Sequence, residues 1–413
     1  MKACVRHFSF FIVIFILLFN LSATAQWVQT NGASGSNVLG FTTKNTDIYA
    51  GYNNGVNSGG VIRSTNYGTD WTNVNTGLPS VEIMALTTLG NDVFASEYDG
   101  GIYLSSDDGA NWNITSLTVE YILGFASIGN NLFAASANNG VYLSTDNGTS
   151  WNFVNSGLTT VATRSIFAAG TNLFVGTHGG GGIFLSTNNG GSWTAVNTGL
   201  TQKYIYTLEK VGSNVFAGSW SAGVFRTTNN GANWTSTSNG LPSDQISAFA
   251  VSGSNLFAAT YGSGVYLSTN NGDSWTEVNN GLTALSLNAL AVCGPYLYAG
   301  GSESGVWRRP LSEMITDVDG NHNDLPVTFD LLQNFPNPFN PSTRISFQLP
   351  KEEFVTLKIY DMLGSEISTL VNEEKPAGKY EVDFNASQLT SGVYIYKIQA
   401  GEFTGANKMI LMK

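Results

Sequence analysis

Short runs of alternating apolar and polar residues recur in a fixed order along residues 26–310. In one copy, apolar residues at Ile83–Leu89 are followed by similar runs at Asp92–Ala95 and Gly101–Leu104, and then by the polar octet Ser105–Trp112. Alternation with a period of two is typical of half-buried β-strands. The pattern predicts four strands per copy: an inner strand, a second and a third strand, and an outer strand that begins at the tryptophan of the octet.

The polar octet occurs six times, and its tryptophans are spaced 39 to 42 residues apart. The copies are Ser64–Trp71, Ser105–Trp112, Ser144–Trp151, Ser186–Trp193, Thr227–Trp234 and Ser268–Trp275. A repeat of about 40 residues with four strands is the signature of a β-propeller blade.

A seventh copy is split between the two ends of the repeat region. Residues 285–307 supply three strands but no octet, whereas Trp27–Gly32 resembles the segment that begins with each octet tryptophan. We therefore predict an all-β, seven-bladed propeller in which Trp27–Asn31 pairs with the strand around Gly305–Arg308. Such closure removes the sheet edges that an open array would expose.

The octets resemble the Asp-box of sialidase-like (BNR) propellers, Ser/Thr-x-Asp/Asn-x-Gly-x-Ser/Thr-Trp. We expect a structural role, in which the third residue accepts backbone N–H bonds, the glycine takes a positive φ and the tryptophan is buried between strands. The third residues are Asn66, Asp107, Asp146, Asn188, Asn229 and Asn270. The tryptophans are Trp71, Trp112, Trp151, Trp193, Trp234 and Trp275. A catalytic or calcium-binding role is disfavoured, because equivalent copies around a ring cannot converge on one substrate.

The first 25 residues have the pattern of a signal peptide. Lys2 and Arg6 precede an apolar run from Phe8 to Phe19, and Ala23-Thr24-Ala25 supplies small residues for cleavage. The run is too short for a transmembrane helix, and no later run approaches the length of one, so we expect no transmembrane segment in the mature chain. Cys293 is then the single remaining cysteine, which favours a small buried residue over a reactive one.

The repeat ends near residue 310, and the character of the chain changes. Residues 311–330 are acidic and lack periodicity, which favours a linker; Asp317–Asn321 faintly resembles a calcium loop, but its glycine falls at the wrong position. Residues 331–413 contain four prolines between 336 and 350 and then short strands bounded by turn residues. The expected strands are 344–349, 355–360, 366–370, 380–384, 393–398 and 408–412, which form a small Ig-like antiparallel sandwich.

Three segments of this region resemble the C-terminal sorting domain (type A) of type IX secretion cargo. They are Asn334–Pro338, Gly392–Lys397 and Lys408–Lys413, in the order that the family has them. The resemblance implies export to the periplasm, passage across the outer membrane by the type IX machinery, and a location on the cell surface or outside the cell. An ordinary Ig-like accessory domain remains the alternative.

Composition narrows the choice of partners. The chain of 413 residues has 18 Lys and Arg against 29 Asp and Glu, a net charge of −11. Nucleic acid is therefore not an expected partner. We expect a monomer.

Candidate binding residues lie where a propeller opens to solvent, at the end of the central channel opposite the octets. Alignment of the copies gives one variable position on each inner strand: Leu39, Met84, Leu123, Arg164, Tyr206, Ser247 and Asn288. Residues just before these positions add Glu82, Tyr121, Tyr204 and Gln245. The ends of the second strands add Tyr52, Glu97, Tyr98, His178, Trp220, Tyr261 and Glu303. Aromatic and polar groups of this kind suit a glycan or a protein ligand, although they can also merely cover the channel rim.

The same residues disfavour known chemistry of Asp-box propellers. A sialidase needs three convergent arginines, and of the arginines in residues 26–310 only Arg164 aligns with the channel. No cofactor motif is visible, and a single His178 is weak evidence for a metal. The sequence thus predicts a secreted or surface-bound binding and scaffold propeller. The alternative is a divergent glycoside hydrolase that uses Glu82 and Glu97 as its acid and base.

Overall fold

The computed structural model describes residues 26–315 and 329–412, except 56–57, 80–81, 120, 243–244, 377 and 402. The predicted signal peptide, most of the predicted linker and Lys413 lie outside these residues. The chain divides into two compact units, residues 1–316 and 317–413. No helix among the described residues is long and apolar enough to cross a membrane.

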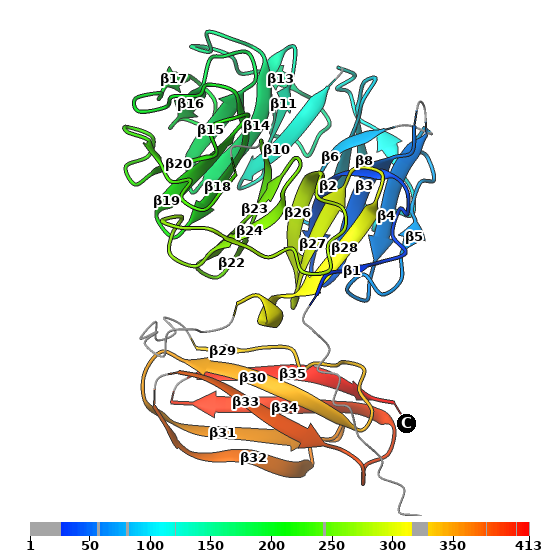
Figure 1. Cartoon of the computed structure of the whole chain (residues 1–413). Helices are drawn as coiled ribbons and strands as arrows, with labels where there is room; N and C mark the ends of the chain where they lie inside the picture. The colour runs from blue at the N-terminus through cyan, green and yellow to red at the C-terminus, as the bar shows by residue number, and fades with distance from the viewer. Residues whose placement is uncertain are drawn as a thin grey trace, which may run out of the picture. The chain divides into compact units, whose positions relative to one another are not determined.

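The first unit consists of four-stranded antiparallel sheets, each built from one sequence copy (Figure 1). The inner strands are β2 (Asn37–Lys44), β6 (Ile83–Leu89), β10 (Ile122–Ile128), β14 (Thr163–Ala169), β18 (Ile205–Val211), β22 (Ile246–Ser252) and β26 (Leu287–Cys293). The second strands are β3 (Asp47–Asn53), β7 (Asp92–Glu97), β11 (Asn131–Ser136), β15 (Asn172–Thr177), β19 (Asn214–Ser219), β23 (Asn255–Thr260) and β27 (Tyr296–Gly301).

The third strands are β4 (Gly59–Ser64), β8 (Ile102–Ser105), β12 (Gly140–Ser144), β16 (Ile183–Ser186), β20 (Val224–Thr227), β24 (Gly264–Ser268) and β28 (Gly305–Pro310). The outer strands are β5 (Thr72–Asn73), β9 (Asn113–Ile114), β13 (Asn152–Phe153), β17 (Thr194–Ala195), β21 (Thr235–Ser236), β25 (Thr276–Glu277) and β1 (Val28–Gln29). Each inner strand contacts the inner strand of the next sheet, and β26 contacts β2, so the sheets form a closed ring of blades.

The N-terminal strand closes the ring, as predicted. Val28 pairs with Arg308 and Gln29 with Trp307, so β1 is the outer strand of the blade formed by β26, β27 and β28 (Figure 1). Trp27 is buried; its backbone N–H donates to Asn280 O (2.8 Å) and its indole N–H to Val278 O (2.7 Å). Trp112 makes the same two bonds to the preceding blade, to Thr76 O and Val74 O. Trp27 therefore replaces the octet tryptophan that the last copy lacks.

The six octets form the same hydrogen-bonded turn. In the second, Ser105 Oγ accepts from Gly109 N (2.8 Å) and donates to Asp107 Oδ1 (2.9 Å), which also accepts from Asn111 N (2.8 Å). The other five repeat these three bonds. The octet glycines have positive φ, from 73° at Gly68 to 89° at Gly109. In each octet the hydroxyl of the Ser or Thr and the side-chain oxygen of the Asp or Asn are thus used to hold the turn.

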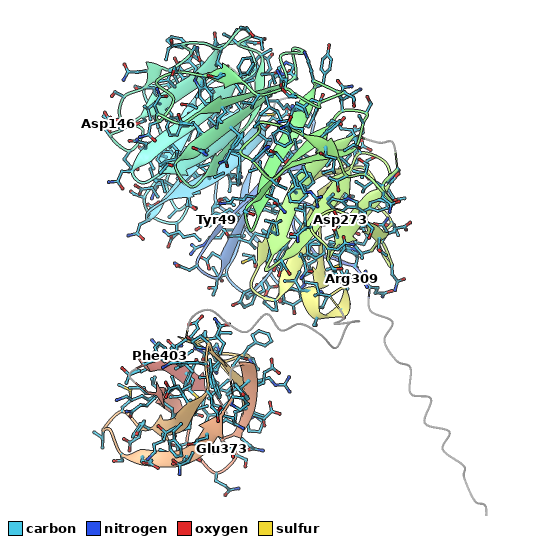
Figure 2. All side chains as sticks on the ribbon, turned by 90° about the vertical axis from the view of Figure 1, so that its left-hand side faces the viewer. Tyr49, Asp146, Asp273, Arg309, Glu373 and Phe403 are labelled. Carbon is cyan, nitrogen blue, oxygen red and sulfur yellow. The ribbon has the colours of Figure 1, made fainter. Side chains whose placement is uncertain are left out.

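Four of the six octet tryptophans link neighbouring blades through hydrogen bonds. Trp112, Trp193, Trp234 and Trp275 are buried, and the indole N–H of each donates to a carbonyl of the preceding blade. Trp71 and Trp151 are only half-buried; the Trp71 indole nitrogen has no partner among the described residues, and that of Trp151 donates to Gly148 O within its own octet. Asp146, in the octet of Trp151, lies at the periphery of the propeller (Figure 2).

The propeller unit extends beyond the predicted boundary at residue 310. Leu311–Glu313 forms a short 3₁₀ helix, η1, and Met314 is buried in the core of the last blade with Trp27 and Trp307. The apolar residues Leu311 and Met314 explain the difference, because they pack against the blade, whereas the predicted boundary followed from the acidic character of residues 311–330 as a whole.

The second unit is an antiparallel sandwich of two sheets. One has the order β29 (Asp330–Leu331), β30 (Ser342–Leu349), β33 (Gly378–Asn385). The other has the order β32 (Glu366–Lys375), β31 (Glu353–Tyr360), β34 (Gly392–Ala400), β35 (Phe403–Leu411). Its core includes Phe347, Ile359 and Tyr396. All six predicted strands are present, and the short β29 begins at Asp330, which the sequence had placed in the linker.

The segment before β30 covers part of the outer edge of β35. Phe339 N donates to Ile410 O (2.9 Å), Met412 N donates to Phe339 O (3.0 Å), and Asn337 Oδ1 accepts from Ile410 N (2.8 Å). The last strand thus completes the sandwich on one side and is hydrogen-bonded to an Asn-Pro-rich segment on the other.

Candidate functional site

One cavity of about 530 Å³ opens at the end of the channel where the inner strands begin. All seven variable inner-strand positions line it: Leu39, Met84, Leu123, Arg164, Tyr206, Ser247 and Asn288. Each of these residues lies within the first three residues of its strand, so one position per blade faces the same space. Gln245, Trp220 and Tyr261 extend the lining toward solvent.

The two largest exposed groups of the lining are aromatic. Trp220 and Tyr261 are 51% and 52% exposed, and each follows the second strand of its blade. The chain places them there because the residue after each second strand bonds back to the residue before its inner strand: Trp220 N to Tyr204 O and Tyr261 N to Gln245 O, both 3.0 Å. Flat apolar faces therefore stand beside amide and hydroxyl groups at the mouth.

Arg164 supplies the positive charge of the cavity. Its Cζ lies 4.5 Å from the ring centroid of Tyr206, a cation–π distance, and Tyr206 lies 5.1 Å from Trp220, centroid to centroid. Burial lowers the pKa of the Arg164 guanidinium from its ordinary value, although the side chain remains charged at any physiological pH. No carboxylate forms an ion pair with Arg164 within the described part of the chain.

His178 lies close enough to Arg164 to respond to its charge. Burial, and next the positive charge of Arg164, lower the pKa of His178 below its usual value. The imidazole is therefore neutral at pH 7, and its Nδ1 is buried without a hydrogen-bond partner in the described structure. Ser165 Oγ and Ser247 Oγ, in residues of the cavity lining, are buried without partners as well. Two residues of the cavity wall, Ser165 and Ser247, thus keep unused hydrogen-bonding capacity, whereas His178 lies outside the lining.

The remaining predicted site residues lie outside the lining. Tyr98 and Tyr121 form an edge-to-face pair with centroids 4.7 Å apart, and Tyr204 is 46% exposed. Tyr52 is half-buried on β3, and Glu303 lies in the turn between β27 and β28. None of these residues is part of the shared cavity.

The two glutamates considered for hydrolysis also lie outside the cavity. Glu97 ends β7 and is buried; burial raises the pKa of its carboxyl, while a hydrogen bond with Tyr103 opposes that rise. Glu82 precedes β6, and its carbonyl accepts from Tyr98 N (3.0 Å). The residues that line the cavity, among those described, include amides and hydroxyls but no carboxylate.

A second cavity, of about 330 Å³, lies at the other end of the channel. It is lined by the later residues of four inner strands, including Phe41, Phe249 and Glu209. Burial raises the pKa of Glu209 to about 7, opposed by a hydrogen bond from Lys210 N (2.8 Å) to its carboxylate. Glu209 was not among the predicted site residues; the signal in the sequence was an acidic residue within an inner strand, beside Lys210.

The architecture is a closed propeller with hydrogen-bonded octet turns, followed in the chain by an antiparallel β-sandwich. Residues 333–412 match the family model of the secretion system C-terminal sorting domain, and residues 24–164 match that of the DUF6242 beta-propeller domain. The second unit is thus a type IX sorting domain, and the chain is exported to the cell surface or outside the cell.

Solved structures with the same fold come from several functional classes. YCF48 from Cyanidioschyzon merolae is 15% identical with a TM-score of 0.55, covering 69% of this chain and 99% of that one. PorZ, a surface component of the type IX secretion system of Porphyromonas gingivalis, is 14% identical with a TM-score of 0.53, covering 91% and 59%. A xyloglucanase from Xanthomonas campestris is 15% identical with a TM-score of 0.55, covering 78% and 59%.

At these identities the likeness concerns the fold alone. This chain spans about three fifths of the length of PorZ and of the xyloglucanase. No curated protein matches the sequence.

Proposed function

We propose that the exported propeller is a binding module that holds a glycan at the channel mouth. The observation that carries the proposal is the convergence of one variable residue per blade on a single cavity. Where a repeat keeps its framework and varies only the positions that face a shared space, those positions are free to form a ligand surface without disturbing the blades.

The chemistry of the lining favours a sugar. Trp220, Tyr206 and Tyr261 offer aromatic faces, and Gln245 and Asn288 offer amide donors and acceptors. Binding pockets of this size combine apolar walls with a few polar groups that fix orientation. The alternative of a glycoside hydrolase needs two carboxylates across the scissile bond, and the candidates Glu82 and Glu97 lie away from the lining. A protein ligand at the same cavity is the other alternative.

A glycan array combined with an assay for newly formed reducing ends tests the proposal. The purified full chain is expected to bind a limited set of glycans without releasing reducing ends from them. Tyr261→Ala, in the lining, should weaken that binding, whereas Glu303→Gln, outside it, should not. Release of reducing ends that Glu97→Gln abolishes would instead establish the hydrolase. Absence of any glycan binding would overturn the proposal.

A further inference from the structure

Arg164 is a half-buried cation that forms no ion pair with any described residue. It lies on β14 at the wall of the mouth cavity, half-buried and stacked against Tyr206. Three of the other four arginines in residues 26–310 form ion pairs with carboxylates, and the fourth, Arg308, donates hydrogen bonds to Tyr67 O and to Thr69 Oγ1 (3.2 Å). Arg63 pairs with Asp47, Arg226 Nη1 lies 2.7 Å from Asp273 Oδ1, and Arg309 Nε lies 3.6 Å from Glu313 Oε2. Arg164 forms no such pair within the described residues.

A charge that is partly removed from water and has no partner costs free energy, which a ligand of opposite charge can recover. Removing a charged group from water is unfavourable unless an opposite charge or hydrogen bonds replace the water. Tyr206 offers only the weak attraction of its ring face. The guanidinium has five N–H donors in a planar fork that matches the geometry of a carboxylate. A carboxylate is therefore the group that the cavity lacks.

The surroundings indicate what carries that carboxylate. Arg164 stacks on Tyr206, and Tyr206 in turn contacts the exposed ring of Trp220. Tyr206 therefore lies between the cation and the exposed aromatic face. Asn288, Gln245 and Ser247 line the same cavity. This combination places a single positive charge beside a stacking surface and beside groups that bond to hydroxyls.

We propose that the mouth cavity selects a glycan residue that bears a carboxylate, a uronic acid or a similar acidic sugar, with Arg164 as the residue that binds its carboxylate. The inference rests on the proposed glycan binding and narrows it. A single cation in a protein of net charge −11 suits one acidic residue at the end of a glycan. A densely charged polyanion would be repelled by the protein as a whole.

The experiment compares matched sugars by isothermal titration calorimetry with the full chain. Oligosaccharides that end in glucuronic or galacturonic acid are paired with the same chains ending in glucose or galactose. The acidic member should bind about 10 to 100 times more tightly, as expected for a charge-assisted hydrogen bond. Arg164→Gln should remove this preference, so that the acidic and the neutral members bind the variant with similar affinity.

Two controls keep the result interpretable. Arg226→Gln removes an arginine on the octet side of the propeller and should leave both affinities as they are. Should Arg164→Gln fail to fold, the wild-type chain still provides a test: about a tenfold rise in salt should weaken binding of the acidic sugars and spare the neutral ones.

The outcomes separate the two proposals. Equal affinity for acidic and neutral sugars, or an acid preference that survives Arg164→Gln, overturns the role of Arg164 while glycan binding stands. Failure of the wild-type chain to bind any sugar overturns the glycan proposal itself. Binding of an acidic peptide, dependent on Arg164 and without sugar binding, overturns the assignment of an acidic sugar.

Discussion

The octets and the first residues of the inner strands belong to the same repeat, but they differ in how much the sequence changes from copy to copy. The octets are nearly constant, whereas the inner-strand positions vary. The octets keep a hydroxyl, an Asp or Asn, a glycine and a tryptophan in every copy, and the same three hydrogen bonds recur. The inner-strand positions change between leucine, methionine, arginine, tyrosine, serine and asparagine. A turn must form in each blade, whereas residues around a channel share one task. The difference therefore separates residues that build the propeller from residues that line the mouth cavity.

The largest loss of stability is expected at the junction where the N-terminal strand closes the ring of blades. Trp27→Ala should lower the free energy of unfolding by about 3–5 kcal/mol, because a buried indole and its bond to Val278 O are lost at the junction of the ring. Urea denaturation of the full chain measures the change. The neighbouring Val28 is 52% exposed, and Val28→Ala should change stability by less than about 0.5 kcal/mol. Equal effects of the two substitutions would contradict closure by Trp27.

A second framework test uses two glycines that differ in their surroundings. Gly157 and Gly170 both have positive φ, 88° and 69°. A Cβ at Gly157 would overlap Trp193 O of the next blade, whereas a Cβ at Gly170 meets nothing within 4 Å.

Gly157→Ala should therefore cost about 3 kcal/mol, from steric overlap added to backbone strain, and Gly170→Ala about 1 kcal/mol, from strain alone. Thermal unfolding of the two variants measures the difference. An equal loss of stability in the two variants would contradict a contribution of the close contact between Gly157 and Trp193 O to the stability of the propeller.

The channel residues should affect stability in a different, pH-dependent way. Glu209 has its pKa raised from 4.5 to about 7, so the folded chain holds a proton that the unfolded chain releases. Its contribution to stability is fully present below pH 4.5 and is lost as the pH rises through 7.

Glu209→Gln should consequently be about 1–3 kcal/mol more stable than the wild type at pH 8, and nearly equal to it at pH 4.5. Chemical denaturation at the two pH values measures this. The exposed Glu277 on β25 provides the control, since Glu277→Gln should show no such difference. A stability gain for Glu209→Gln that does not vary with pH would contradict the burial of a protonated carboxyl.

Much of the fold could be predicted because the same pattern of strands and octet recurs in several copies along the sequence. Tryptophan spacing located the blades, and the resemblance of Trp27–Gly32 to the octet ends located the closing strand. Alternation also located the strands of the sandwich. The 3₁₀ helix at Leu311–Glu313 could not be predicted in this way, since it depends on packing of Leu311 and Met314 against the last blade.

The residues of the candidate site could be predicted only where the position of a residue in the repeat determines whether it lines the cavity. The variable inner-strand residues all reach the cavity because each occupies the same place in its blade. Glu97 does not, because its side chain is buried beside Tyr103. At the ends of the second strands, Trp220 and Tyr261 reach the lining and Glu97 and His178 do not, a distinction set by local packing that the sequence pattern does not contain.

The most direct test of the account is a comparison of two exposed aromatic residues in glycan binding. Trp220 lines the mouth cavity, whereas Tyr98, also exposed, lies outside its lining. Using the tightest ligand from the array, titration calorimetry of the full chain should show at least about a tenfold loss of affinity for Trp220→Ala and unchanged affinity for Tyr98→Ala. Unchanged binding by Trp220→Ala together with loss in Tyr98→Ala would contradict the assignment of the ligand site to the channel mouth.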